Sequence, residues 1–293
     1  MLKKKNFENR PGYIWLDGKF VRWNKAKIHV LTHGLHYASC VFEGARIYKG
    51  KIFKLKEHTK RLFFSSKILG FKLPYTEKTI NKACEQIIKK QNIKNGYLRP
   101  FAWRGSEMMA ISAQNTTIHV AIATWEMTTY FDKRKKFNGI KLQTSKWMRP
   151  QSNTAPTQAK AAGLYMICTL SKHIAEEKGF DDSLMLDSNG YVAESTGANI
   201  FFVKNNKLYT PVADCFLNGI TRQTVIQLAK KNNIKVIEKR ILPKELLKAD
   251  EIFLTGTAVE ITPVSQIDNK KFKIGEITQK LVSLFSNLIE SKY

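Results

Sequence analysis

The sequence predicts an α/β protein of two domains, a small α+β domain followed by a larger α/β domain. Its 293 residues are enough for two moderate domains. Strand-like runs alternate with segments of helical periodicity in both halves. Between residues 128 and 138 the chain turns polar and basic, with few residues that could be buried. We therefore place a small N-terminal domain at residues 1–128, an interdomain linker at 129–138 and a large C-terminal domain at 139–293.

The first half is expected to open in a sheet. Asp17-Gly18 separates two short apolar runs, and this dipeptide supplies the positive φ angles that a tight hairpin turn needs. Helical periodicity then predicts helices over 56–69, ending at Gly70, and over 76–90, starting at Thr76. Strands are expected at 97–103 and 117–125.

The second half is expected to begin with a strand at 140–145. A long helix over about 160–178 follows, ended by Gly179. Asn189-Gly190 and Asn205-Asn206 then mark hairpin turns. The remaining predicted elements are helix 221–232, strands 234–240 and 251–255, and helix 276–290.

Composition is typical of a soluble globular protein, at 43% hydrophobic and 25% charged residues. No run approaches the roughly 18 apolar residues of a membrane span, and the basic start lacks the apolar core of a secretory signal. We therefore expect a cytoplasmic protein without membrane association. Four dispersed cysteines show no metal-ligand spacing, which predicts buried thiols and no metal site.

The charge balance raises the question of nucleic-acid binding. Lys and Arg number 49 against 24 acidic residues, a formal net charge of +25. Most basic residues are scattered over apparent helix faces, and no recognition motif with interleaved aromatic residues accompanies them. We predict no nucleic-acid function.

A loop before the predicted helix at 160 surrounds one lysine with small residues. Ala159, Ala161, Ala162 and Gly163 flank Lys160. Space around the amine suits a Schiff base, and both burial and a helix start lower a lysine pKa toward the range of a nucleophilic amine. Taken alone, the segment fits an ordinary solvated lysine better.

Three further segments could hold an anionic, nitrogen-bearing cofactor. Glu194 follows a predicted strand and could pair with a pyridinium nitrogen, although a solvated glutamate is the simpler interpretation. Residues 217–224, which open a helix, and 255–258, which end a strand, could bind phosphate through backbone amides, or be a plain cap and a plain turn. Arg61 could add a bidentate phosphate contact.

Together the segments resemble one family over about residues 13–268. They look like the ordered motifs of the branched-chain amino acid aminotransferases, which are class IV enzymes dependent on pyridoxal 5'-phosphate (PLP). The motifs are His36-Tyr-Ala-Ser-Cys-Val-Phe-Glu-Gly-Ala-Arg, Glu57-His-Thr-Lys-Arg-Leu, Gly96-Tyr-Leu-Arg-Pro, Ala159-Lys-Ala-Ala-Gly-Leu-Tyr, Glu194-Ser-Thr-Gly-Ala-Asn, Gly219-Ile-Thr-Arg and Thr255-Gly-Thr-Ala-Val-Glu-Ile-Thr-Pro-Val.

The resemblance implies the fold of type IV PLP enzymes, with the cofactor at the domain interface. It implies that Lys160 forms the Schiff base and then moves the proton between substrate Cα and cofactor C4′. Glu194 would bind the pyridine nitrogen and Tyr165 the phenolic oxygen. The phosphate would be held by a group of four residues: Arg61, Ile220, Thr221 and Thr257.

The resemblance also implies a substrate site. Tyr97 and the amides of Thr257 and Ala258 would meet the α-carboxylate. An apolar pocket for Leu, Ile or Val would be lined by Phe42, Tyr37 and Tyr165. Arg99 would receive the distal carboxylate of glutamate, so that one pocket accepts both kinds of side chain.

The implied activity is transamination between L-leucine, L-isoleucine or L-valine and 2-oxoglutarate, with ping-pong kinetics, in a homodimer at minimum. Assembly into hexamers, which some relatives form, is left open. Trp125, Tyr130 and the loop 104–115 depart from the family pattern and receive no role. The alternatives are a D-amino acid or amine aminotransferase or aminodeoxychorismate lyase of the same fold, and a non-catalytic scaffold or nucleic-acid-binding protein.

Overall fold

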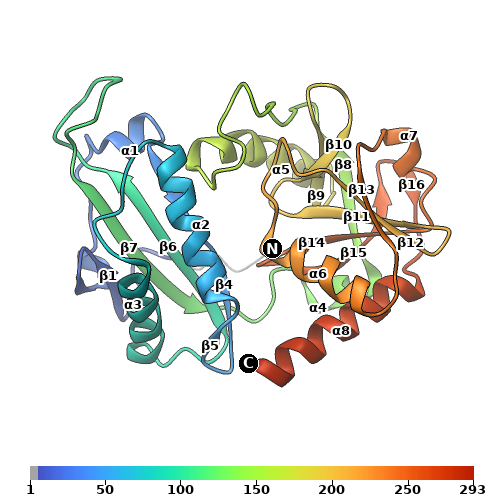
Figure 1. Cartoon of the computed structure of the whole chain (residues 1–293), viewed down its shortest axis with the longest axis horizontal. Helices are drawn as coiled ribbons and strands as arrows, with labels where there is room; N and C mark the ends of the chain where they lie inside the picture. The colour runs from blue at the N-terminus through green and yellow to red at the C-terminus, as the bar shows by residue number, and fades with distance from the viewer. Residues whose placement is uncertain (1–5) are drawn as a thin grey trace. The chain divides into compact units, whose positions relative to one another are not determined.

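The computed structural model describes residues 6–293, which divide into two compact units (Figure 1). Unit 1 contains the described residues up to Thr128, together with Ala159–Gly163 and Tyr293. Unit 2 contains Thr129–Gln158 and Leu164–Lys292. The first five residues of the predicted N-terminal domain lie outside the described part. Both units combine helices and sheets, which confirms the predicted α/β class.

Unit 1 is built on an antiparallel sheet. Among the described residues its strands follow the order β2-β1-β7-β6-β4-β5, and β3 also pairs with β6. The strands are β1 (Tyr13–Leu16), β2 (Lys19–Arg22), β3 (Cys40–Phe42), β4 (Ala45–Tyr48), β5 (Lys51–Ile52), β6 (Gly96–Arg104) and β7 (Ile118–Glu126). The predicted opening hairpin is confirmed, and both turn residues, Asp17 and Gly18, have positive φ.

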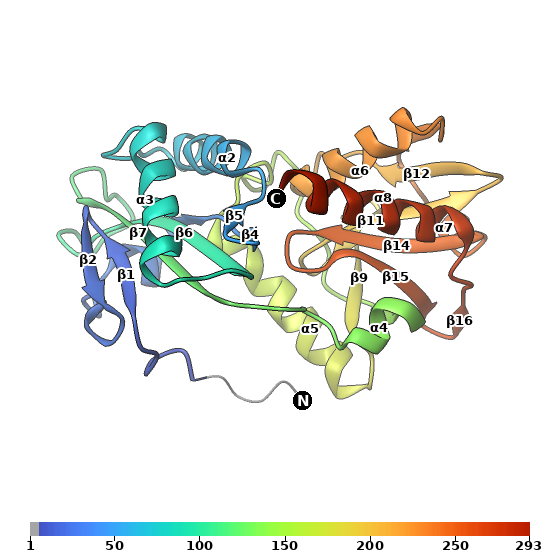
Figure 2. The same ribbon diagram turned by 90° about the horizontal axis from the view of Figure 1, so that it is seen from below.

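Helices cover one face of this sheet. Figure 2 shows α2 (Leu55–Ile68) and α3 (Glu77–Lys90) side by side above strands β6 and β7. The Thr76 hydroxyl accepts a hydrogen bond from the Thr79 amide, so the predicted start of α3 is confirmed. An apolar core fills the space between helices and sheet. The other helices of the unit are short, a 3-10 turn (Trp23–Lys25) and α1 (His33–His36).

The sheet of unit 2 closes on itself. Its strands follow the order β10-β9-β8-β15-β14-β11-β12-β13, and β10 also pairs with β11, so the strands from β10 through β11 form a closed ring. β16 pairs with β15. The strands are β8 (Ile140–Thr144), β9 (Asp182–Leu186), β10 (Val192–Ser195), β11 (Asn199–Lys204), β12 (Lys207–Pro211), β13 (Val236–Lys239), β14 (Glu251–Gly256), β15 (Glu260–Ile267) and β16 (Lys270–Lys271).

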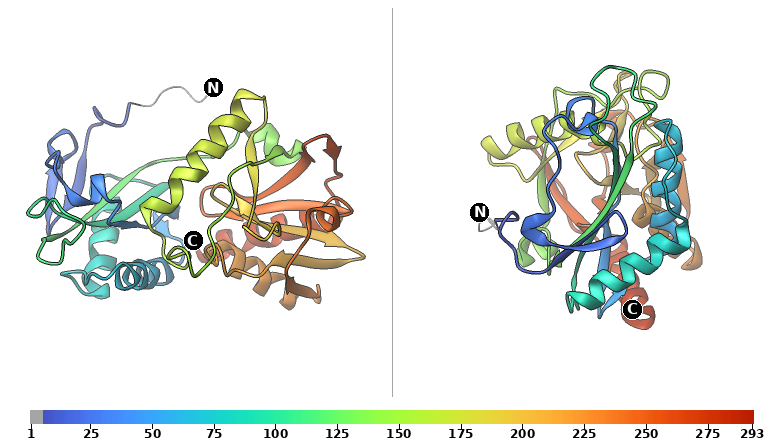
Figure 3. Two further views of the ribbon diagram at one scale, coloured as in Figure 1. Left: turned by 90° about the horizontal axis from the view of Figure 1, so that it is seen from above. Right: turned by 90° about the vertical axis from the view of Figure 1, so that its left-hand side faces the viewer.

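Helices surround this ring. α5 (Met166–Glu177) packs on β9, as the left view of Figure 3 shows, while α6 (Ile220–Lys231) and α8 (Glu276–Lys292) pack together on β14. The shorter helices are α4 (Lys133–Asn138), within the stretch predicted as a linker, and α7 (Pro243–Leu246). The turns predicted at Asn189-Gly190 and Asn205-Asn206 join β9 to β10 and β11 to β12, which confirms both hairpins.

Candidate active site

Lys160 lies in an extended segment of unit 1. Its backbone N–H donates to Ser65 Oγ on α2 at 2.9 Å, and its carbonyl accepts from the Phe42 N–H on β3 at 3.0 Å. Ala161 forms a β-bridge with Val41. The predicted helix start at residue 160 is therefore wrong: a 3-10 turn (Ala162–Tyr165) comes first and α5 begins at Met166. Pairing with β3 holds the lysine backbone extended, so no helix terminus acts on it.

A buried charged cluster lies in the same unit. Glu43, fully buried after β3, accepts from Arg61 Nε at 2.6 Å and Nη2 at 3.0 Å, both from α2. His58, one turn before Arg61, contacts Glu43 Oε2 through Nδ1 at 2.6 Å. The His58 Nε2 atom is buried and has no hydrogen-bond partner among the described residues.

The cluster fixes the charges of its members. Burial alone raises the pKa of Glu43, but Arg61 and His58 outweigh it and the pKa lies well below the usual carboxyl range. Burial lowers the pKa of His58, and Arg61 and Lys160 lower it further against the opposing pull of Glu43. The arrangement therefore holds an ionised Glu43, a cationic Arg61 and a neutral His58 that donates from Nδ1.

The predicted substrate residues of unit 1 gather around Phe42. The Lys160 Nζ lies 4.9 Å from the Phe42 ring centre, and the Arg99 guanidinium lies 4.7 Å from it and 5.4 Å from the ring centre of Tyr97. Arg99 Nε is buried and has no hydrogen-bond partner in the described part of the chain. Tyr37 is 42% exposed and stacks on His33 with ring centres 4.6 Å apart.

Gly44 makes room for one of these side chains. A Cβ atom at this position would lie 1.8 Å from the Tyr97 hydroxyl oxygen. Glycine in the Phe42-Glu43-Gly44 motif is thus required by the close approach of the Tyr97 phenol. Phe42, Tyr97 and Arg99 are therefore brought together in unit 1.

Glu194 lies in unit 2, within β10, rather than after a strand as predicted. It faces Asn199 across the β10–β11 pair, and Asn199 Nδ2 donates to Glu194 Oε2 at 3.2 Å. Arg149 Nε lies 3.5 Å from Glu194 Oε1. The Arg149 Nη1 donates to the Leu164 carbonyl at 3.2 Å and to Cys168 Sγ at 3.3 Å. The carboxylate thus has a buried cation on one oxygen and an amide donor on the other.

The N-terminus of α6 supplies backbone amides in the same unit. Gly219 is the N-cap and makes no side-chain cap hydrogen bond. The amides of Ile220 and Thr221 have no acceptor within the helix, because helices leave their first N–H groups unpaired. Both residues are buried, and the first turn carries no acidic side chain. This terminus has the electrostatic character of an anion site.

The end of β14 places a polar side chain next to Asn199. Thr255 faces Asn199 across the β11–β14 pair, so Glu194, Asn199 and Thr255 form a row across three strands. The buried Thr255 hydroxyl has no hydrogen-bond partner among residues 6–293. Thr257 and Ala258 are half-buried in the turn that leads into β15.

The predicted site residues therefore fall into two groups, one in each unit. Unit 1 contains Lys160, Arg61, Phe42, Tyr37, Tyr97 and Arg99. Unit 2 contains Tyr165, Glu194, Ile220, Thr221, Thr257 and Ala258. Sequence reasoning gave no role to four residues that contact these groups: Glu43, His58, Arg149 and Asn199. Three of them lie inside the motifs quoted above, so motif membership was the available signal.

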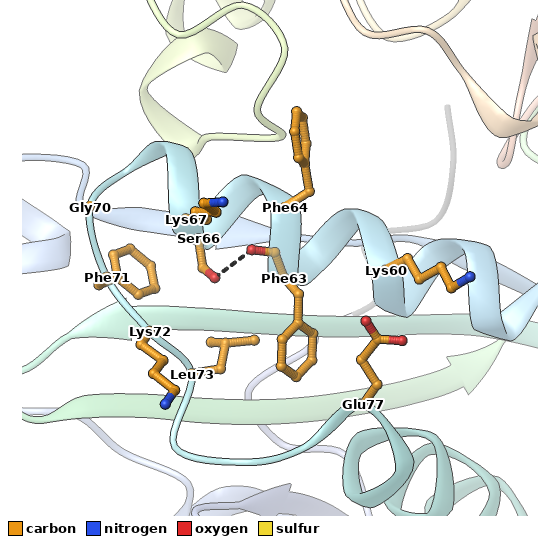
Figure 4. A pocket seen from close by; sticks show the side chains of 10 residues that line it. All are labelled: Lys60, Phe63, Phe64, Ser66, Lys67, Gly70, Phe71, Lys72, Leu73 and Glu77. Carbon is orange, nitrogen blue, oxygen red and sulfur yellow. Dashed lines mark hydrogen bonds between the residues drawn. The ribbon is translucent and has the colours of Figure 1, made fainter.

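Other features of the described residues do not include the predicted site residues. A cavity of about 600 Å³ lies between α2 and the loop that follows it. Figure 4 shows the aromatic and lysine side chains that line it, such as Phe63, Phe71 and Lys67. It contains none of the predicted site residues. In the described residues, His, Cys, Asp and Glu do not gather in groups of three that could hold a metal ion. None of the helices within residues 6–293 has the length and apolarity needed to cross a membrane.

The cysteines are free thiols. Three are buried, and Cys40 is half-buried. Burial raises the pKa of Cys168 to about 11 and that of Cys215 to about 12. They therefore remain protonated and unreactive at neutral pH.

A family model for class IV amino-transferases matches residues 40–267, which is most of the chain and includes nearly all the residues described above. The chain belongs to the class IV aminotransferase family. A branched-chain-amino-acid aminotransferase of Pseudomonas aeruginosa is 41% identical to this class IV aminotransferase over 291 residues, covering 97% of this chain and 95% of the relative. The enzyme of that name from Escherichia coli is 38% identical over 288 residues, covering 95% and 93%.

Solved structures give the same result for this class IV aminotransferase. The Escherichia coli branched-chain amino acid aminotransferase superposes with a TM-score of 0.93 at 36% identity, covering 96% of this chain and 95% of the other. A branched-chain aminotransferase of Thermoproteus uzoniensis with norvaline gives 0.92 at 36% identity, with coverages of 96% and 95%. An aminotransferase from Brucella abortus bound to PLP gives 0.85 at 28% identity, with coverages of 96% and 100%.

Proposed function

We propose that this class IV aminotransferase transfers the amino group of L-leucine, L-isoleucine or L-valine to 2-oxoglutarate, giving the branched 2-oxo acid and L-glutamate by a ping-pong mechanism. The observation that carries the proposal is Arg99, whose guanidinium lies against two aromatic rings and keeps a buried Nε–H without a described partner. An aromatic wall suits a branched side chain, and an arginine within it suits the distal carboxylate of glutamate.

PLP is the proposed cofactor. The residues of unit 2 fit a phosphorylated pyridine: a carboxylate in Glu194, the first-turn amides of Ile220 and Thr221, which have no acceptor within the helix, and the buried Thr255 hydroxyl, which has no hydrogen-bond partner among the described residues. When bound, PLP supplies the electron sink that permits loss of the proton from substrate Cα.

Residues of this chain bind the cofactor and move the protons. Lys160 would hold the cofactor, and its amine would take up the proton that leaves substrate Cα. Glu194 keeps the ring nitrogen protonated, and Tyr165 binds the phenolic oxygen. The phosphate is held by Arg61, Ile220, Thr221 and Thr257.

Substrate binding is divided between recognition of the α-carboxylate and of the side chain. Tyr97 and the amides of Thr257 and Ala258 take the α-carboxylate. The apolar pocket is formed by Phe42, Tyr37 and Tyr165. Because one methylene in such a pocket changes binding by only about 1–3 kcal/mol, Leu, Ile and Val are all substrates.

We further propose a cytoplasmic homodimer as the minimum working unit, with small molecules as ligands and neither nucleic acid nor membrane as partner. Support for self-association comes from unit 1. Around α1 and the loop at residues 105–112, joined by hydrogen bonds from His33, apolar side chains are exposed. They are Ile28, Val30, Leu31, Leu35 and Ile111.

The experiment is an absorbance spectrum of the purified protein, recorded before and after L-leucine and then after 2-oxoglutarate. We expect the visible absorbance of the enzyme-bound cofactor to disappear with L-leucine and to return with 2-oxoglutarate. Protein that stays colourless after PLP is added contradicts the proposal. Faster bleaching by D-alanine than by L-leucine assigns the D-amino acid alternative instead.

A further inference from the structure

We propose that Asn199 is a positioning residue that ties Glu194 to the N-terminus of α6, so that one amide side chain aligns the partner of the cofactor's ring nitrogen with the amides that hold its phosphate. The inference rests on the proposed function, because it takes Glu194 as the partner of the ring nitrogen and the α6 amides as the phosphate site. All residues involved belong to unit 2.

The hydrogen bonds of Asn199 use both ends of its amide. Nδ2 donates to Glu194 Oε2 at 3.2 Å and to the Leu217 carbonyl at 3.0 Å. Oδ1 accepts from the Gly219 N–H at 3.2 Å. An asparagine amide offers two donor hydrogens and one acceptor oxygen, so each group is used. Because the residue is only 4% exposed, its side chain has little freedom to turn away from these partners.

The sheet holds Asn199 at this junction. It is paired directly with Glu194 on β10 and with Thr255 on β14. Residues directly opposite each other on antiparallel strands have Cβ atoms roughly 4.5–5.5 Å apart on one face. The position of the Asn199 amide is therefore set by two neighbouring strands, and the loop 217–219 takes its position from the amide.

Gly219 is matched to this contact. A Cβ atom at residue 219 would lie 2.2 Å from Asn199 Oδ1. The φ of Gly219 is −59°, which any residue can adopt, so the glycine is required by the close approach of the amide and not by backbone conformation. Gly219→Ala therefore perturbs the same junction from its other side.

The chemistry of the amide suits both partners. A neutral donor stabilises the ionised form of Glu194, which is the form that keeps a pyridine nitrogen protonated. A carboxylate at position 199 would add a like charge to this buried site and would lose both donors. Asn199→Asp is thus nearly isosteric but reverses the electrostatic effect, while Asn199→Ala removes it.

The test compares dissociation constants for PLP and for pyridoxal, which lacks the phosphate, by absorbance titration of the full-length protein. If Asn199 serves both ends, Asn199→Ala raises the Kd for PLP by about 10-fold to 100-fold. The rise for pyridoxal is smaller, so the ratio of the pyridoxal Kd to the PLP Kd falls. Gly219→Ala lowers the same ratio. The pH at which the bound cofactor changes absorbance also shifts in Asn199→Asp.

Three results separate the possibilities. An unchanged Kd for PLP in the Asn199 variants overturns the inference. Equal increases for PLP and pyridoxal overturn the link to α6, because Asn199 then serves Glu194 alone. Wild-type protein that binds no PLP overturns the proposed function instead. Asn232→Ala, at the opposite end of α6, is the matched control and should bind both probes as wild type does. Asn199→Asp keeps the volume of the side chain and tests the inference should Asn199→Ala fail to fold.

Discussion

Arg61 on α2 holds Glu43 with two nitrogens, Nε at 2.6 Å and Nη2 at 3.0 Å, and the carboxylate between them is fully buried. Buried ion pairs have a large desolvation cost that only good geometry offsets. The proposed phosphate contact therefore requires an arginine whose orientation is already fixed by Glu43. In the proposed function the cluster therefore orients Arg61 for the phosphate, and it is also part of the core of unit 1.

Removing the charge of Glu43 should strongly destabilise the protein. Glu43→Gln removes the buried carboxylate charge that the Arg61 guanidinium, 15% exposed, contacts, and breaking a buried pair on one side costs about 3–5 kcal/mol. The free energy of unfolding in urea measures this. Asp250→Asn is the control, because it breaks an exposed pair with Lys204 and should cost less than about 1 kcal/mol. Equal losses of unfolding free energy in the two variants would show that the buried Glu43–Arg61 pair is no more stabilising than an exposed pair.

The protein should lose stability in mild acid because of His58. Its pKa is lowered in the folded state, so below the ordinary value of 6.5 the unfolded chain binds a proton that the folded chain excludes. Stability therefore falls as pH decreases through this range, by at most about 1.4 kcal/mol per pH unit. Glu43, whose folded pKa is also lowered, adds a further loss at lower pH as its carboxylate becomes protonated.

His58→Gln isolates the first effect, because glutamine can still donate to Glu43 but does not titrate. The free energy of unfolding between pH 8 and pH 5 should fall less in this variant than in wild type. His36→Gln, on the exposed end of α1, should keep the wild-type slope. A wild-type slope in His58→Gln would show that His58 is not the group responsible.

Substitution of Arg99 should weaken the half-reaction with 2-oxoglutarate more than the half-reaction with L-leucine. Arg99→Met keeps an unbranched apolar side chain beside Phe42 but removes the charge. A hydrogen bond to a charged group contributes about 1.5–3 kcal/mol, so the apparent affinity for 2-oxoglutarate should fall about 10-fold to 100-fold. Single-turnover rates with L-leucine serve as the internal control and should change much less. Equal loss in both directions would remove Arg99 from glutamate recognition.

Local patterns predicted much of the fold. The Asp17-Gly18 and Asn189-Gly190 turns, the Thr76 cap and the end of α5 near Gly179 depend on residues close in sequence, and the structure confirms each. The closing of the sheet in unit 2 depends on pairing between β10 and β11 together with strands far apart in the chain. Periodicity carries no information about such pairings.

The errors at the candidate site have the same origin. The small residues around Lys160 favour a helix locally, but hydrogen bonds to α2 and β3 hold this segment extended. His58 and Glu43 are residue types that usually lie at the surface. In the structure both are buried, because each supplies a hydrogen-bond partner for the other. The family motifs led to the correct family because they are compared as whole sequence segments. Such a comparison does not require the tertiary contacts of each residue to be known.

Chemical identification of the lysine that carries the cofactor tests the proposed role of Lys160 most directly. PLP-loaded protein is reduced with borohydride, which converts the C=N link to a stable secondary amine, and is then digested and analysed by mass spectrometry. We predict a pyridoxyl phosphate group on the peptide that contains Lys160, and none in a Lys160→Ala variant. A modified lysine elsewhere in the wild-type protein, or no modified lysine at all, would contradict the assignment of Lys160 as the residue that binds PLP.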